Sequence, residues 1–208
     1  VFKLNSDLSA LFWSTYLGSN DADTAFGVRV NNAGEIYVTG TAGSPNFPTT
    51  NGTIQSVWPG GEESAYVAVL SSNGQQLLRS TFWGTDKNDH SYFLDLDEMG
   101  NVHIYGQTTG VMPISPGAYS FIPGSPQFIS AFSSDLETLV YSTVIGDGPL
   151  NTNVPFPGIS GKFDFVPAAF MVDKCDFIYF SGYQFNVSRP LATTPDAVSS
   201  NSGSFYLG

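Results

Sequence analysis

Acidic residues recur in comparable stretches of this 208-residue chain, and their type and spacing are suited to chemistry. Asp21 and Asp23 stand in one predicted loop, Asp86 and Asp89 in a later one, and Asp147 in a third. Carboxylate oxygens are the ligands that calcium prefers, and paired carboxylates hydrolyse glycosidic bonds. Asp also caps tight turns through its own backbone neighbours. The pattern therefore allows a calcium site at Asp21, Asp23, Asp86 and Asp89, with turn capping as the competing interpretation, and selects no catalytic pair.

Aromatic residues in two long connections are the second group of candidates. The connections 41–64 and 108–125 are longer than most loops in compact domains and are rich in Pro and Gly. Aromatic rings on stiff loops can stack on sugars or anchor a protein partner. Phe47 belongs to a Phe-Pro-Thr-Thr motif that recurs, which favours packing, whereas Trp58 has no counterpart in the second repeat. The candidate binding residues are Trp58, Phe47, Tyr119 and Phe121.

The remaining reactive side chains do not form a catalytic pattern. His103 aligns with Tyr37 at an aromatic strand position, and His90 has no second histidine near it. Cys175, the one cysteine, aligns with a turn glycine of the other repeats and has no histidine neighbour to lower its pKa. The chain also lacks a Gly-x-Ser-x-Gly elbow. These observations predict a protein that is not an enzyme.

Internal repetition shows which elements must position these residues. The segment Ser-Thr-Tyr-Leu-Gly at 14–18 returns in related form at 80–84 and 142–146, at offsets of 66 and 62 residues. The segment Gly-Glu-Ile-Tyr-Val-Thr-Gly at 34–40 returns at 100–106. Elements that recur in a fixed order are the signature of a repeat architecture.

The repeat predicts an all-β fold made of short antiparallel strands. The units run over 1–65, 66–127 and 128–204, with a further unit starting at 205. The strands predicted in the middle unit are Tyr66–Leu70, Leu77–Trp83, Tyr92–Asp97 and Val102–Gln107. Four strands per unit with apolar residues on both faces favour β-propeller blades over a two-layer sandwich. Because about four to eight blades close a ring, we expect residues 1–208 to be a partial propeller, about three blade units of a longer one.

The net charge of the chain limits the classes of molecule that it can bind. The chain has 7 basic and 18 acidic residues, for a net charge of -11, so nucleic acid and anionic membranes are disfavoured. Divalent cations and neutral ligands such as glycans remain possible partners. No apolar run is long enough to span a bilayer. Since the sequence has no initiator Met and no signal peptide, we interpret it as a mature or cut product.

The motifs together resemble a known family. Trp13–Gly18, the Gly-x-Ile-Tyr-Val-Thr-Gly-Thr run at 34–41, Asn46–Thr50 and Ala65–Ala68 are similar to the bacterial SBBP β-propeller repeat. The segment 169–175 is similar to propellers in very large surface proteins of Bacteroidota. The resemblance implies export by the type IX secretion system, through a gliding-motility-associated C-terminal domain outside this chain. It weakens in the third unit and brings no catalytic residues.

The sequence therefore predicts a non-enzymatic binding or scaffold propeller at the cell surface. Adhesion, gliding motility or envelope assembly are the expected roles, with a protein or glycan partner and an extracellular or outer-membrane-associated location. Two alternatives stay open: a glycan-active hydrolase or lyase, and a calcium-stabilised structural spacer. No cofactor is expected other than calcium.

Overall fold

The computed structural model describes residues 1–119, 122–146, 148, 165–184 and 194–196. Its described part consists of strands and turns, as expected, with no helix long and apolar enough to cross a membrane. The strands are β1 (Phe2–Leu4), β2 (Leu11–Ser14), β3 (Thr24–Val30), β4 (Ile36–Ala42), β5 (Ser64–Leu70), β6 (Leu77–Trp83), β7 (Asp89–Leu96), β8 (Val102–Thr108), β9 (Gln127–Phe132), β10 (Leu139–Ile145), β11 (Phe165–Val172) and β12 (Ile178–Gln184).

The strands form four antiparallel sheets in chain order. Strands β3 to β6 make one four-stranded sheet, called sheet 1 here, and β7 to β10 make a second, called sheet 2. Strands β1 and β2 pair with each other, as do β11 and β12. The four strands predicted for the middle unit are found as β5, β6, β7 and β8.

Each four-stranded sheet combines strands from two successive sequence repeats. The predicted unit 66–127 begins with β5, whereas the hydrogen-bonded sheets begin with β3 and β7. The break between sheets falls in the connection 84–88. A periodic sequence shows the length of the repeat, but every starting point within that length gives the same period. The strand pairing therefore sets the sheet boundary two strands away from the boundary of the sequence unit.

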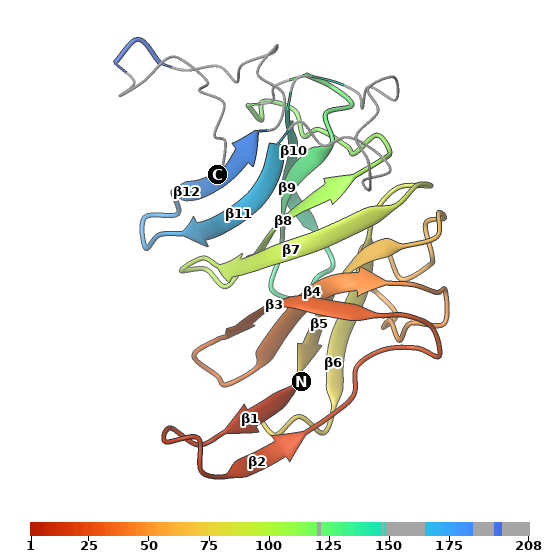
Figure 1. Cartoon of the computed structure of the whole chain (residues 1–208), viewed down its shortest axis with the longest axis vertical. Helices are drawn as coiled ribbons and strands as arrows, with labels where there is room; N and C mark the ends of the chain where they lie inside the picture. Colours follow the sequence, from red (N-terminus) through yellow and green to blue (C-terminus); the bar gives the residue numbers. More distant parts are fainter. Residues whose placement is uncertain (120–121, 147, 149–164, 185–193, 197–208) are drawn as a thin grey trace, which may run out of the picture.

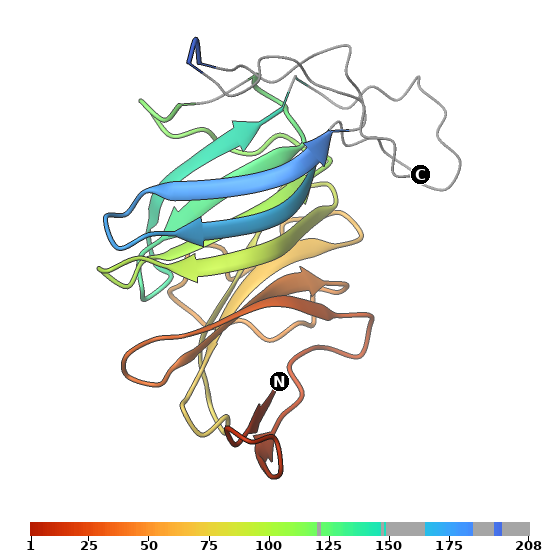
Figure 2. The ribbon, with the colours of Figure 1, turned by 60° about the vertical axis from the view of Figure 1, so that its left-hand side comes forward.

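The sheets stack face to face along the long axis of the molecule (Figure 1). Their first strands, β3, β7 and β11, lie next to one another, and a turned view shows the same stacking (Figure 2). Between sheets 1 and 2, Tyr37 and Trp83 pack with Leu94 and Phe132 in one buried core. Trp83 meets Phe132 edge-on at 5.0 Å between ring centres and donates from Nε1 to the hydroxyl of Ser130.

Turn positions with positive φ repeat with the sheets. Gly34, Gly100 and Asp176 have φ of 82°, 82° and 62° at the equivalent turn of β3–β4, β7–β8 and β11–β12. The aspartate, and not Cys175, thus occupies the glycine position, which corrects the alignment expected for the cysteine. The two positions are neighbours, and only the backbone conformation separates them. Asp tolerates left-handed φ better than most residues, because its short polar side chain bonds locally.

Candidate binding surface at the long-loop end of the sheets

In the part of the chain that the structure describes, the connections between sheets and the long connections within them lie at one end of the strands. This long-loop end consists of residues 15–23, 43–63, 84–88 and 109–119. The opposite, short-turn end has the tight turns between β3 and β4 and between β5 and β6. Because consecutive strands run antiparallel, the acidic loops and the long aromatic connections of the described residues share this end.

Asp23 ties two of these loops together. Its Oδ2 accepts hydrogen bonds from the backbone N–H and the hydroxyl of Ser19, and its Oδ1 accepts from the backbone N–H of Gly43 at 3.0 Å. The carboxylate therefore satisfies donors from the loop that enters β3 and from the loop that leaves β4. This is the capping role that the sequence offered as an alternative to calcium binding.

Asp89 has the same role in the next sheet, at a fully buried position. Its Oδ2 accepts from the backbone N–H of Thr85 at 2.6 Å and from the Thr85 hydroxyl at 3.1 Å. Its side chain is 0% exposed, and this burial raises the pKa of Asp89 to about 6, against the opposing effect of hydrogen bonds from Thr108 and Thr85. A buried carboxylate with several donors holds a loop in place, but no part of it is open to a ligand.

Asp21 and Asp86 differ from half-buried Asp23 and buried Asp89 because both are exposed. The Asp86 carboxylate lies 3.5 Å from the ammonium of Lys87, and its side chain is 77% exposed. Among the described residues no three His, Cys, Asp or Glu side chains come together in a way that could hold a metal ion. Calcium binding by Asp21, Asp23, Asp86 and Asp89 stays a prediction.

The aromatic candidate residues differ in how deeply their side chains are buried. Phe47 is 2% exposed and lies on Tyr66 with 4.3 Å between ring centres, so in this structure it packs in the core. Trp58 is half-buried and meets Phe82 edge-on at 5.2 Å. Tyr119 is 72% exposed. Phe121 lies outside the described residues. Tyr16, which the sequence did not select, lies at this end and is fully exposed, so the aromatic side chains accessible here include Tyr16 and Tyr119, with Trp58 partly covered.

Glu63 and His90 add a polar group at this end that the sequence did not pair. The His90 Nε2 lies 3.4 Å from the Glu63 carboxylate, and its Nδ1 lies 3.1 Å from the Thr41 hydroxyl. Its ring stacks on Tyr92 at 6.0 Å, and burial lowers the pKa of His90. The sequence analysis considered only a second histidine as a partner of His90. Its partners are Glu63, from the loop before β5, and Thr41, from β4, which lie 27 and 49 positions earlier in the chain.

His103 belongs to a different, buried network near the short-turn end. Its Nδ1 lies 2.7 Å from the Tyr141 hydroxyl, and its Nε2 lies 3.0 Å from the Asp97 carboxylate. Burial alone would raise the pKa of Asp97, but hydrogen bonds from His103 and Asn101 outweigh that effect and lower it. The ring is 4% exposed and lies at the repeat position of Tyr37, so it links strands and turn.

Cys175 is exposed and unpaired at the β11–β12 turn. Its backbone N–H donates to the Asp173 carboxylate at 2.8 Å, which also accepts from the N–H of Phe177. The turn is thus held by Asp173, and the thiol takes no part in it. Comparison with known proteins adds nothing to these observations, since no family model and no curated protein matches the chain.

Proposed function

We propose that the sheets are blades of a β-propeller. Support comes from two successive four-stranded antiparallel sheets with the same strand order, packed face to face through a common core. Their first strands lie side by side, as inner strands around an axis would. Phe26 of β3 and Tyr92 of β7 contact each other at 5.2 Å along this inner row.

We further propose that the protein is a non-enzymatic binding or scaffold module of a secreted or cell-surface bacterial protein. The observation that carries this proposal is the composition of the long-loop end. Asp23 and Asp89 are committed to holding loops, while Tyr119 and the acids Asp21 and Asp86 are exposed and Trp58 is half-buried at the same end. Such a surface suits recognition by aromatic contact and hydrogen bonding. Adhesion, gliding motility and type IX export rest on the sequence resemblance.

The net charge of -11 favours a neutral or basic partner. A glycan presents hydroxyls and apolar ring faces, which aromatic side chains stack against, and a surface protein can present basic side chains to Asp86 and Glu62. Both partner types fit the same end of the molecule, so one binding assay covers them.

The test is a binding screen of the chain against surface polysaccharides and envelope proteins of its source. We expect Tyr119→Ala and Trp58→Ala to weaken binding of any ligand found by about ten-fold or more. Trp58→Phe keeps an aromatic ring against Phe82 and separates binding from folding. Phe177→Ala is the matched control, because Phe177 is 64% exposed at the short-turn end. A ligand whose affinity falls with Phe177→Ala but not with the other two would contradict the proposal.

A further inference from the structure

The chain contains two Asn-Gly dipeptides, which the structure places in different surroundings. Asn51-Gly52 lies in the connection between β4 and β5, and Asn73-Gly74 lies in the turn between β5 and β6. Gly52 and Gly74 both have positive φ, at 89° and 68°, and both asparagines are exposed. The two dipeptides therefore form a matched pair that differs in local contacts.

Hydrogen bonds hold both residues of the second dipeptide. The Asn73 Oδ1 accepts from the Ser71 hydroxyl at 2.7 Å and from the backbone N–H of Gln75 at 3.1 Å, and the Asn73 Nδ2 donates to Oε1 of Gln75 at 3.2 Å. The backbone N–H of Gly74 donates to the Ser71 carbonyl at 2.8 Å. Gly74 is also buried against the Trp13 ring, which a Cβ at this position would meet at 2.6 Å. The amide of Asn73 and the nitrogen of Gly74 are therefore both engaged.

The first dipeptide has no such contacts. Neither the Asn51 amide nor the Gly52 N–H makes a hydrogen bond with any residue that the structure describes. Gly52 is exposed, and the atom nearest to a Cβ built on it is Oε1 of Glu137, at 3.9 Å. The Asn51 side chain and the nitrogen that follows it are thus open to water and can approach each other.

The residues on either side of the first dipeptide are fixed to neighbouring elements. The N–H of Thr50 donates to the Ser80 carbonyl of β6 at 2.9 Å, and the Thr53 hydroxyl donates to the Thr50 carbonyl at 2.8 Å. The N–H of Ile54 donates to the carbonyl of Leu136, in the turn between β9 and β10, at 2.8 Å. The dipeptide is therefore the exposed tip of a loop that ties sheet 1 to sheet 2.

We propose that Asn51 is a site of spontaneous deamidation and isomerisation. After solvent base removes the proton from the Gly52 nitrogen, this nitrogen attacks Cγ of Asn51 and forms a new C–N bond. The bond between Cγ and Nδ2 breaks, and Nδ2 takes up a proton and leaves as ammonia, which gives a cyclic succinimide. Water then adds to either carbonyl carbon of the ring and breaks its bond to nitrogen, which gives isoaspartate or aspartate. Water is the only other reactant consumed, and no oxidation occurs.

The contacts decide which of the two asparagines reacts. Attack requires that the amide carbon of the asparagine and the nitrogen of the glycine approach each other, and glycine offers the least hindrance because it has no Cβ. At the second dipeptide the hydrogen bonds to Ser71 and Gln75 must break first, whereas the first dipeptide has none to break among the described residues. Breaking one or two hydrogen bonds of ordinary net strength slows a reaction by about ten-fold or more.

The reaction changes the loop in which it occurs. Both products add a negative charge next to Gly52, whose nearest neighbouring side chain is already the carboxylate of Glu137. Isoaspartate also adds a methylene to the main chain between Thr50 and Thr53, the two residues that anchor the tip. The modification therefore alters both the charge and the geometry of the contact between sheets 1 and 2 at this loop.

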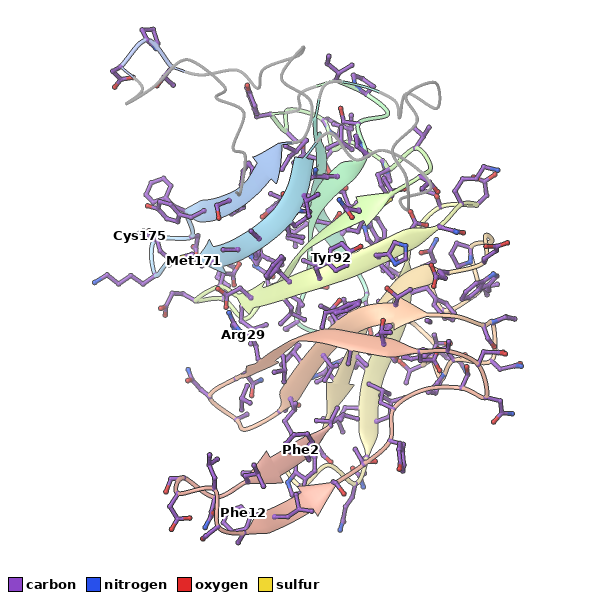
Figure 3. The ribbon with its side chains drawn as sticks, viewed as in Figure 1. Phe2, Phe12, Arg29, Tyr92, Met171 and Cys175 are labelled. Atoms are coloured by element: carbon purple, nitrogen blue, oxygen red, sulfur yellow. The ribbon has the colours of Figure 1, made fainter. Side chains whose placement is uncertain are left out.

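The test follows the two asparagines in one peptide. The chain is incubated in mildly alkaline buffer, in one sample folded and in another unfolded by urea. Trypsin cleaves after Arg29 and Arg79, so both asparagines lie on the tryptic peptide 30–79, and its fragmentation in a mass spectrometer measures conversion at each position. Cys175, the exposed thiol that Figure 3 shows at the β11–β12 turn, follows Lys174 and lies on a different tryptic peptide, so its oxidation does not disturb the measurement.

We expect Asn51 to convert at least about ten-fold faster than Asn73 in the folded chain, and both to convert at similar rates in urea, where neither keeps its contacts. In isotopically labelled water, one labelled oxygen should enter at each converted asparagine. Equal rates in the folded chain, or faster conversion of Asn73, would overturn the proposal.

Two matched variants give the second readout. Asn51→Gln lengthens the side chain by one methylene, so the same attack has to form a larger ring, and this variant should lose most of the deamidation of the folded chain. Asn73→Gln should leave that deamidation unchanged. A folded Asn51→Gln chain that releases ammonia as fast as the wild-type chain would overturn the proposal. Since ligand binding is measured separately, that result would leave the proposed function standing.

Discussion

The first strands β3 and β7 have the same pattern but opposite surroundings. Val28 and Leu94 occupy the same repeat position, 66 residues apart, yet Val28 is 52% exposed and Leu94 is 2% exposed. Phe170, at the corresponding position of β11, is 7% exposed. Strand β7 lies between β3 and β11, whereas β3 has a neighbouring first strand on one side only among the described residues.

This difference shows that β3 has an apolar residue suited to burial, Val28, at a position that no neighbouring strand of the described residues covers. An apolar residue at the same position of each repeat indicates that the same buried environment recurs. The repeat in which this residue is exposed therefore marks where a further sheet fits. Matched residues with different surroundings also occur at turns and in hydrogen-bond networks, so substitutions at equivalent positions should have different effects on stability.

The largest effect is expected at the turn before the fourth strand. Leu8 and Leu136 have φ of 62° and 61° there, a conformation that glycine adopts without cost. Leu136 is 0% exposed and Leu8 is 72% exposed. Leu136→Gly should therefore lower the free energy of unfolding by about 3–5 kcal/mol, while Leu8→Gly should raise it by about 0.5–1 kcal/mol.

Chemical denaturation of the two variants checks this contrast. Loss of stability with Leu8→Gly as large as with Leu136→Gly would mean that the N-terminal hairpin is covered in the same way as β9–β10, and the comparison would fail.

The next effect is expected at the matched pair on β3 and β7. Leu94→Ala removes a side chain from the core between the sheets and should cost about 2–5 kcal/mol in unfolding free energy. Val28→Ala should cost less than about 1 kcal/mol in the monomer, because half of that side chain already contacts water. Urea denaturation at low protein concentration measures both, and equal losses would contradict the open face.

A pH-dependent effect is expected at Asp89. Its folded-state pKa, about 6, is raised above the ordinary value of 3.8, so the neutral acid is favoured by folding. The stabilisation is complete below about pH 4 and is lost as pH rises through about 6, which amounts to about 2–3 kcal/mol. Relative to Asp89→Asn, which does not titrate, the wild-type chain should gain that much stability between pH 7 and pH 4.

Denaturation curves of the two proteins at several pH values give this difference. A stability difference that is constant across the pH range, or that moves in favour of the variant at low pH, would show that burial does not raise the pKa of Asp89.

The smallest effect distinguishes the two hydrogen-bond networks at the short-turn end. Tyr141 and Arg79 are equivalent fourth-strand residues, and they bond His103 at 2.7 Å and Glu35 at 3.1 Å. Tyr141→Phe leaves a buried imidazole nitrogen without its partner and should cost about 1–2 kcal/mol. Arg79→Met breaks a partly exposed ion pair and should cost less than about 1 kcal/mol. Thermal melting of both variants measures these losses, and we expect Tyr141→Phe to lose more stability than Arg79→Met.

Much of the fold followed from the sequence, because strands and turns leave local signals. Short recurring runs with apolar residues on both faces predicted strands β5 to β8. The position of the sheet boundary did not follow, since a period has no starting point. Cys175 was placed on the wrong turn position because a one-residue shift is visible in φ but not in the amino-acid types.

The candidate site was less predictable. The acidic loops and the long connections share an end because consecutive strands of each sheet run antiparallel. The burial of Phe47 and Asp89, in contrast with exposed Tyr119 and Asp86, depends on packing between segments distant in sequence. The contact of Glu63 with His90 likewise requires the loop before β5 to reach the start of β7.

The most direct test of the account is an experimental structure of the intact protein, resolved well enough to trace strands. We expect β1 to be paired on both edges, a two-stranded hairpin to lie beside it, and Val28 and Val30 to be buried beneath that hairpin. A structure in which the outer edge of β1 is unpaired and both valines contact solvent would contradict the claim that these sheets belong to a closed ring.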